Sequence, residues 1–261
     1  MAPMDTERSS VPPSGRLTAD RMQRILTDLF NQRYVGVLQA KDAESAKEFY
    51  FAGTGVKLTS LGPRRSLPAG RFWVCAGFLA EETLAQTLQI QAEKRGMIGD
   101  LLVNGGHLTE AQRDAGLVEQ FLEELCDMFF WPSPEYHYRQ GHQTRVGELD
   151  IDREKSGAKS LSLKADLAKV SAQAKVNAHN LREAGRQLGG VGVSYAATAG
   201  AKEVLFAKDR FAALPPAQRV LLPVFAKPHS AAEIIEEGQV PWSRVLTGMA
   251  EFLRNGWISK A

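Results

Sequence analysis

The feature that most constrains the fold of this chain is a 24-residue unit that occurs twice. Residues 68–91 and 97–120 align without a gap at an offset of 29 residues. The pairs that are identical between the copies are Gly70/Gly99, Val74/Val103, Gly77/Gly106, Leu79/Leu108, Glu81/Glu110, Leu88/Leu117 and Gln91/Gln120. Because an internal repeat indicates a structural unit that is built more than once, we expect two copies that pack as a pseudo-symmetric helical pair.

Each copy has the same internal order. A short apolar stretch, 72–74 or 101–103, is followed by a glycine turn and then by an acid that begins a helix. In the second copy Thr109 is placed as an N-cap, and the apolar stripe that follows predicts a helix as far as Phe129. The sequence "WPSP" then ends that helix, since proline cannot continue it.

The segments around the repeat predict a small α+β domain. Thr18 is placed to cap a helix that ends near Arg33. Two runs rich in β-formers, "YVGVLQA" and "KEFYFAG", predict a hairpin, and "VKLTSLG" predicts a third extended piece. After the repeat, "EYHYRQG" alternates like an edge strand.

The C-terminal part predicts a second fold. A long helix is expected from Leu163 to Leu181, and "GGVGVSYAATAG" is interpreted as a loose, glycine-rich break. From Leu214 onward, three helices and a terminal strand favour a winged-helix-like domain. The expected division is a disordered tail at 1–16, a domain at 17–152 that contains the repeat, a helical connector at 153–213 and the winged-helix-like domain at 214–261. The fold class is α+β.

The distribution of charge and the number of cysteines limit the class of protein and the compartment in which it functions. Residues 81–154 hold 15 acids against 6 lysines and arginines, whereas residues 155–210 hold 10 basic residues against 4 acids. Whether these segments pack on each other stays open. Cys75 and Cys126 are too few for a disulfide framework, so we expect two buried thiols. Without a signal peptide or a membrane-length apolar run, we expect a cytoplasmic protein that does not insert into membranes.

Short motifs in the N-terminal part resemble the PATAN domain, a bacterial signalling module. The matching segments are 36–38 ("GVL"), 50–53 ("YFAG") and Trp131 with Tyr136 and Tyr138. A winged-helix-like tail is also common in proteins that carry this domain. The resemblance implies work through protein–protein contacts, in families tied to response regulators, motility or pilus machinery.

The repeat is similar to the tandem motif of MshEN domains, which bind cyclic di-GMP. That motif is also a 24-residue unit written twice with a five-residue spacer, here "AEKRG". Its leading arginine is replaced by Pro68 and Met97, and Arg113 stands where leucine is expected. The ligand-binding residues that this resemblance implies are Arg64, Arg65, Gly70, Arg71, Gly77, Gln91, Gly99, Gly106 and Gln120. The alternative is architectural: the glycines permit turns and close helix approach, the leucines fill a core, and Gln91 and Gln120 cap neighbouring backbone.

Other functions have less support in the residues. No metal-ligand spacing accompanies Cys126, His137 or His142, and no catalytic dyad or phosphate loop is present, so we expect a non-enzymatic protein without a cofactor. DNA binding by the winged helix is disfavoured, because residues 211–261 carry a net charge of only +1 and the sequence stops after the first wing strand.

We therefore interpret the chain as a bacterial signalling or scaffold protein that acts through protein–protein contacts. A cyclic di-GMP receptor and a DNA-binding regulator are the alternatives. Four acids of the helix after Thr109 form the expected docking face for a basic partner: Glu119, Glu123, Glu124 and Asp127.

Overall fold

The computed structural model describes residues 12–31, 35–43, 45–52, 56–61, 67–94, 96–132, 134–140, 159–163 and 166–261. It has an α+β fold, as expected. Two compact units divide the chain: one comprises residues up to 66 together with 124–176, and the other comprises 67–123 together with 177–261. This division differs from the expected domain boundaries, because the repeat belongs to the C-terminal unit and not to the sheet domain. The boundary expected near residue 152 lies outside the described residues.

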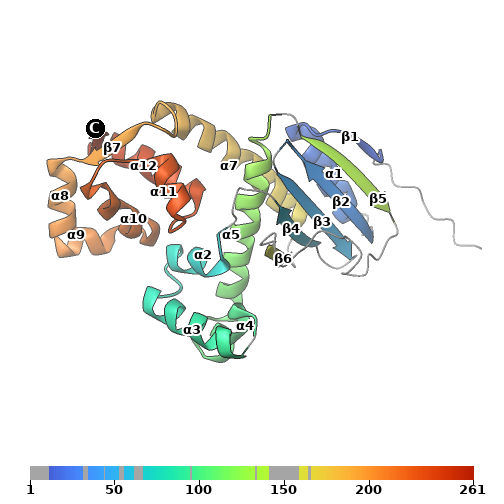
Figure 1. Ribbon diagram of the computed structural model, residues 1–261, viewed down its shortest axis with the longest axis horizontal. Helices are drawn as coiled ribbons and strands as arrows, with labels where there is room; N and C mark the ends of the chain where they lie inside the picture. The colour runs from blue at the N-terminus through green and yellow to red at the C-terminus, as the bar shows by residue number, and fades with distance from the viewer. Residues whose placement is uncertain are drawn as a thin grey trace, which may run out of the picture. The chain divides into compact units, whose positions relative to one another are not determined.

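The first unit is built on a six-stranded antiparallel sheet (Figure 1). The strand order is β1-β5-β2-β3-β4-β6. The strands are β1 (Ser14–Arg16), β2 (Val35–Lys41), β3 (Ala46–Ala52), β4 (Val56–Leu61), β5 (Glu135–Gln140) and β6 (Lys159–Leu163). The predicted hairpin is confirmed, because β2 pairs with β3 from Val35 opposite Ala52 to Lys41 opposite Ala46.

Two expectations about this sheet are corrected. Ser14–Arg16, which the sequence assigns to the disordered tail, form β1 and pair with β5. Consequently β5 is not an edge strand, since β1 lies on one side of it and β2 on the other. The segment "SGR" is short and has no alternating apolar residues, so it carries no strand signal.

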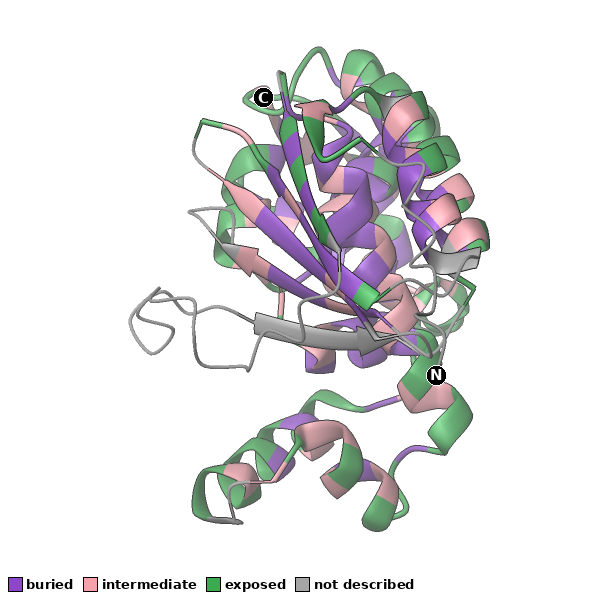
Figure 2. Cartoon of the chain, turned by 90° about the vertical axis from the view of Figure 1, so that its right-hand side faces the viewer, coloured by how far each residue is buried: buried purple, intermediate pink, exposed green. Residues whose placement is uncertain are grey.

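The helices of this unit pack on one face of the sheet. Ala40, Lys47 and Tyr136 lie opposite one another on adjacent strands and therefore share a face. Lys47 pairs with Glu124 of α5 (Glu110–Met128), and the Tyr136 hydroxyl accepts a hydrogen bond from Arg21 of α1 (Ala19–Asn31) at 3.0 Å. Figure 2 shows buried residues concentrated along the central strands.

The second unit begins with four helices of the repeat and continues with a helical C-terminal part. The repeat comprises α2 (Ala69–Cys75), α3 (Glu81–Lys94), α4 (Ile98–Asn104) and α5 (Glu110–Met128). The later helices are α7 (Leu167–Gln187), α8 (Ala199–Phe206), α9 (Lys208–Ala213), α10 (Pro216–Leu221), the 3-10 helix η1 (Leu222–Ala226), α11 (Ala231–Glu237) and α12 (Trp242–Arg254). Helices α5 and α7 each continue from one unit into the other.

A three-stranded sheet completes the C-terminal domain, by which we mean residues 194–261. Its strands are β7 (Ser194–Ala197), β8 (His229–Ser230) and β9 (Ile258–Lys260), in the order β8-β7-β9. The central strand β7 comes from the segment interpreted as a glycine-rich break, so that expectation is wrong. The Tyr195 side chain explains the strand, because it is fully buried and its hydroxyl donates to the Leu188 carbonyl at 2.8 Å.

The order of helices and terminal strand expected of a winged helix is present in α10, α11, α12 and β9. Ser230 caps α11 with a reciprocal capping box to Glu233, and Gly238 ends that helix at a φ of 68°. The buried residues of α11, α12 and β9 include Ile234, Val245, Leu246, Met249, Phe252 and Ile258. The strand beside β9 is β7, which precedes these helices in sequence, so the described residues of the domain form no hairpin wing.

Candidate interaction site in the tandem repeat

The two copies of the repeat fold into the same elements at the same offset. Helices α2 and α4 begin 29 residues apart, and so do helices α3 and α5. The predicted N-cap at Thr109 is confirmed, because its hydroxyl accepts from the Gln112 amide at 3.2 Å. The repeat is therefore a pair of helix–turn–helix units. The helix after each turn is predicted by the sequence, whereas α2 and α4 lie where the sequence predicts only short apolar stretches.

Glycines make both turns. Gly77 and Gly106 adopt φ values of 76° and 71°, a conformation that favours glycine because it has no Cβ. In each copy the glycine follows the C-cap of the first helix and donates its amide to a carbonyl of that helix, Val74 or Val103. The identical glycines at these positions are therefore explained by the turn.

The other glycine pair that is identical between the copies, Gly70 and Gly99, permits close packing of the helices. A Cβ at Gly70 would lie 2.5 Å from Leu84 Cδ1, and a Cβ at Gly99 would lie 3.2 Å from Arg113 Cδ. Leu84 and Arg113 are equivalent positions. The methylene groups of Arg113 thus pack where leucine packs in the first copy, while its guanidinium pairs with Asp100 and Asp114.

The two glutamines make equivalent hydrogen bonds, each from one copy to the backbone just before the other copy. This exchange is the pattern of two copies related by a pseudo-twofold axis. Gln91 Nε2 donates to the Gly96 carbonyl at 2.9 Å, just before the second copy. Gln120 Nε2 donates to the Leu67 carbonyl at 2.7 Å, just before the first copy. Each copy therefore caps the backbone that leads into the other.

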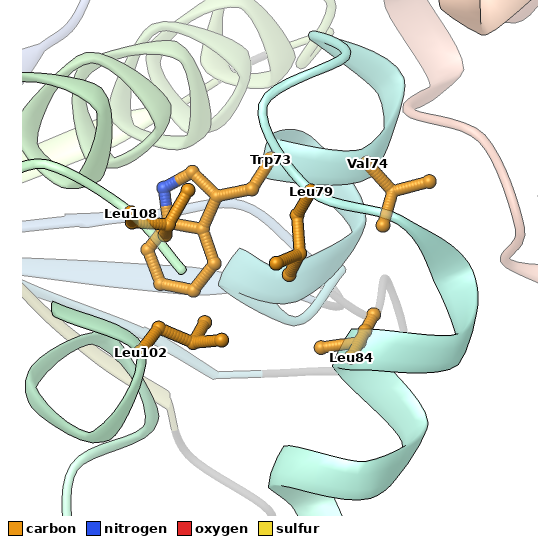
Figure 3. Close-up of a cluster of buried hydrophobic side chains, with 6 residues drawn as sticks. All are labelled: Trp73, Val74, Leu79, Leu84, Leu102 and Leu108. Carbon is orange, nitrogen blue, oxygen red and sulfur yellow. The ribbon is translucent and has the colours of Figure 1, made fainter. Parts of the chain in front are cut away.

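A shared hydrophobic core lies between the copies (Figure 3). Trp73 and Leu79 of the first copy meet their equivalents Leu102 and Leu108 of the second. Trp73 also donates from its indole nitrogen to the Arg113 carbonyl at 3.1 Å. Gly116 makes room for this ring, because any Cβ at that position would overlap the indole. Trp73 and Leu102 occupy equivalent positions but differ in size. The backbones of the two copies are therefore more alike than their core side chains.

The first copy is packed against the C-terminal domain. A Cβ at Gly77 would lie only 2.6 Å from Pro216 Cγ, so the proline ring rests on this turn. Arg71 donates from Nε to the Gln239 carbonyl at 2.9 Å and pairs with Glu81 at 2.7 Å. Arg71, one of the residues expected to bind a nucleotide, is therefore engaged in contacts within the unit.

The N-terminus of α12 is part of the same contact. Glu123 accepts a hydrogen bond from the Trp242 amide at 2.9 Å and another from the Ser243 hydroxyl. Arg244 pairs with Glu119 and donates to the Cys75 carbonyl at 3.3 Å. The carboxylate at the helix N-terminus complements its positive end.

Burial in this contact controls the chemistry of Cys75. The predicted burial of both thiols is confirmed, since Cys75 and Cys126 are both buried. Burial raises the pKa of the Cys75 thiol to about 11, although Arg71 and Arg244 oppose the shift. Such a thiol is protonated at neutral pH and is not an activated nucleophile.

The four acids of the expected docking face on α5 all contact other residues of this chain. Glu124 is buried against Lys47 and accepts from the Ser60 hydroxyl at 2.6 Å. Asp127 lies 3.2 Å from Lys47 Nζ and accepts from the Trp131 indole at 3.1 Å. Glu119 and Glu123 contact α12 as described above. The periodicity of α5 places these acids on helical faces but does not reveal that both units supply partners for them.

Among the described residues of this unit, the positions equivalent to this contact are more exposed. We call Arg71, Cys75, Gly77 and Glu119 the docked face; its equivalents, which we call the open face, are Asp100, Asn104, Gly106 and Ile90, so each face combines residues of both copies. Cys75 is completely buried, whereas Asn104 is exposed, and the Ile90 side chain is 42% exposed. A Cβ at Gly106 would meet no atom within 4 Å.

Sequence reasoning missed the residues that cover the docked face. Pro216 and Arg244 lie far from the repeat in the sequence, and neither belongs to a motif that points to it. The signal in the sequence that points to such a contact is the pair of acids Glu119 and Glu123 on α5, which can accept hydrogen bonds from a basic residue or from a helix N-terminus.

The nucleotide-binding residues implied by the MshEN resemblance are only partly brought together. Gly70, Gly99, Gln91 and Gln120 lie at the junction of the two copies, while Gly77 and Gly106 lie at the turns. Arg64 and Arg65 lie outside the described residues. Within the part of the chain that the structure describes, no group of three or more His, Cys, Asp and Glu residues is arranged to hold a metal ion.

Comparisons of this chain with protein-family models, with curated proteins and with solved structures find no match. Among the described helices, none combines the length and the apolar character needed to cross a membrane.

Proposed function

We propose that this chain is a non-enzymatic signalling or scaffold protein of bacterial type that acts through protein–protein contacts. The observation that carries the proposal is the docking of the C-terminal domain on the repeat. The N-terminal residues of a recognition helix contact base edges in helix-turn-helix proteins. Here that end of α12 contacts Glu123 and Glu119 instead. The N-terminal end of α12 thus contacts protein, namely α5 of its own unit.

The sequence resemblance to PATAN domains supports the same proposal and extends it to response-regulator, motility or pilus systems. The test is affinity capture with the full chain from cells that express it natively, followed by purification of the recovered protein and measurement of 1:1 binding. A stoichiometric partner with micromolar or tighter affinity supports the proposal. Recovery of no protein that binds the purified chain contradicts it.

DNA binding is tested in parallel with the full chain at low ionic strength. Because residues 211–261 carry a net charge of only +1, we expect no salt-steep binding to duplex DNA. Binding that falls steeply between 50 and 200 mM salt would contradict the proposal, since that dependence is the signature of phosphate neutralisation.

A second candidate function, cyclic di-GMP binding, is favoured by the pseudo-twofold symmetry of the repeat. The ligand is itself twofold symmetric, and the reciprocal bonds of Gln91 and Gln120 place both copies around one axis. Against it, Arg71 already contacts Glu81 and Gln239. Calorimetric titration, with GTP as the control nucleotide, distinguishes the two. Selective binding near 1 µM, about −8 kcal/mol, would favour the receptor, and its loss in the charge-reversed variants of Arg64, Arg65 and Arg71 would assign the site.

A further inference from the structure

We propose that the contact between the C-terminal domain and the docked face of the repeat is a reversible, autoinhibitory contact. In the closed state, which the structure shows, the repeat covers the N-terminal end of α12. In the open state the C-terminal domain has separated from the repeat, both remain folded, and this end of α12 is accessible to a partner. Because the motion occurs within the chain itself, it does not require the partner of the proposed function.

The contacts that hold the closed state are largely polar. Arg71 donates to the Gln239 carbonyl at 2.9 Å, and the Pro216 ring supplies an apolar contact. Arg244 pairs with Glu119, but their side chains are 31% and 40% exposed, so water and salt weaken the attraction. Interfaces between domains of one chain permit relative motion unless they are large and apolar. We therefore expect this contact to open more readily than the domain unfolds.

The N-terminal end of α12 receives its cap from the repeat. Pro241 stands at the N-cap position of α12, and its side chain cannot accept a hydrogen bond. Glu123 of α5 accepts from the Trp242 amide at 2.9 Å and from the Ser243 hydroxyl instead. By contrast, α11 of the same domain is capped by its own Ser230. Because water also satisfies the first amides of a helix, α12 can exchange the external cap for solvent when the contact opens.

The C-terminal domain has a hydrophobic core of its own. Phe252 of α12 is fully buried and packs edge-on against Phe225 of η1, with 6.2 Å between the ring centroids. Trp257 lies against the same Phe252 ring at 5.7 Å, and Tyr195 of β7 is also fully buried. These contacts lie within the domain and do not involve the repeat. The domain can therefore separate from the repeat as a folded body.

Helix α7 offers a point at which the domain can move. The end of α7 belongs to the domain, because the Leu188 carbonyl just after it accepts from the Tyr195 hydroxyl at 2.8 Å. Gly185 lies just before this end, and a Cβ there would meet no described atom within 4 Å. Packing therefore does not require glycine at this position, and glycine weakens a helix relative to alanine. Bending of α7 at Gly185 allows the domain to leave the repeat.

The experiment uses Cys75 to report opening, because its thiol is buried in the closed contact. The full chain with Cys126→Ala is labelled with a thiol reagent at urea concentrations below its unfolding transition. The reference is the same chain with Cys75→Ala and Ala201→Cys, since Ala201 is fully buried on α8, which packs on β7 and η1. Each rate is divided by the rate in the unfolded chain. We expect Cys75 to label roughly tenfold or more faster than Ala201→Cys, with a weaker dependence on urea, because opening exposes less surface than unfolding.

A charge variant then tests whether Glu119 holds the contact closed. Glu119→Gln removes the ion pair with Arg244 and should raise the Cys75 labelling rate roughly three- to fivefold. Sodium chloride at about 0.5 M should raise the rate in the Cys126→Ala chain and have less effect once Glu119→Gln is present. Glu93→Gln, the same change at an exposed acid of α3, should leave the rate within about 1.5-fold.

Two results would overturn the reversible contact. Equal rates and equal urea dependence for Cys75 and Ala201→Cys would mean that the contact opens only when the domain unfolds. Equal Cys75 rates in Glu119→Gln and Glu93→Gln would mean that the ion pair does not hold the contact closed. Either result leaves the protein-contact function to its own capture experiment, and failure to capture a partner does not change the labelling rates.

Discussion

The two copies of the repeat have the same backbone and different surroundings. In the first copy, Arg71, Cys75 and Gly77 contact the C-terminal domain; in the second, Asp100, Asn104 and Gly106 are exposed. The shared features are those needed for folding: glycines at turns, glutamines that cap backbone and leucines in the core. Some divergent pairs lie in the core, such as Trp73 and Leu102, and others lie where the first member contacts the C-terminal domain, such as Cys75 and Asn104. The identical residues therefore maintain the repeat, and the divergent surface residues determine its contacts.

The largest expected effect breaks the core that both copies share. Trp73→Ala removes a fully buried indole and its hydrogen bond to Arg113, so we expect unfolding to become easier by about 3–5 kcal/mol. Urea unfolding followed by circular dichroism measures this change. Phe206→Ala, at an exposed aromatic, should stay within about 0.5 kcal/mol. Similar midpoints for the two variants would show that Trp73 is not a core residue.

The turn glycines sharpen the comparison, because they differ only in their surroundings. Gly106→Ala places a Cβ in a left-handed conformation and should cost about 1–2 kcal/mol. Gly77→Ala has the same strain and also overlaps Pro216, which should add about 1–3 kcal/mol. Urea unfolding of both variants checks the difference. Equal costs would mean that Pro216 does not rest on the first turn.

Titration of Cys75 makes the free energy of unfolding depend on pH, whereas its equivalent Asn104 has no titratable group. The pKa of the thiol is about 11 in the folded chain, against 9.0 for a thiol in the unfolded chain, so the unfolded chain loses this proton first as pH rises. Stability from this thiol is present below pH 9 and falls between about pH 9 and 11, by up to about 3 kcal/mol.

The measurement for that prediction is the stability of the wild type minus that of Cys75→Ala at pH 8, 9, 10 and 11. Other groups that titrate in this range contribute to both proteins and cancel. The difference should shrink as pH rises. A difference that does not change with pH would place Cys75 in contact with solvent.

The smallest expected effect concerns the reciprocal glutamines. Gln120 is 1% exposed, whereas Gln91 is only partly buried. Removal of the buried amide should cost more, about 1–2 kcal/mol for Gln120→Ala against about 0.5–1 kcal/mol for Gln91→Ala. Chemical denaturation of the two variants tests the order, and a larger cost for Gln91→Ala would contradict it.

Much of the fold follows from local patterns in the sequence. The 29-residue offset predicts the paired helical units, and two neighbouring runs rich in β-formers, "YVGVLQA" and "KEFYFAG", predict the hairpin. Thr18 and Thr109 mark helix N-termini that the structure confirms. These signals are local, so a single sequence suffices to read them.

The features that the sequence does not predict depend on contacts with residues that are remote in the sequence. The acids of α5 look like a solvated or docking face, because Lys47, Ser243 and Arg244 are remote in sequence. Strand β7 is concealed by glycines, and only the burial of Tyr195 in the three-stranded sheet explains it. The candidate site has the same limit: equivalence of Cys75 and Asn104 is visible in the alignment of the copies, but the occupant of one face is not.

The most direct test of this account compares thiol reactivity at one pair of equivalent positions. In a Cys126→Ala background, the native Cys75 is labelled with a thiol reagent at pH 8 and compared with a Cys75→Ala chain that carries Asn104→Cys. The account predicts rapid labelling through Asn104→Cys and labelling of Cys75 only as the C-terminal domain detaches or the unit unfolds. Equal labelling rates would contradict it, because the docked and open faces would then be the same.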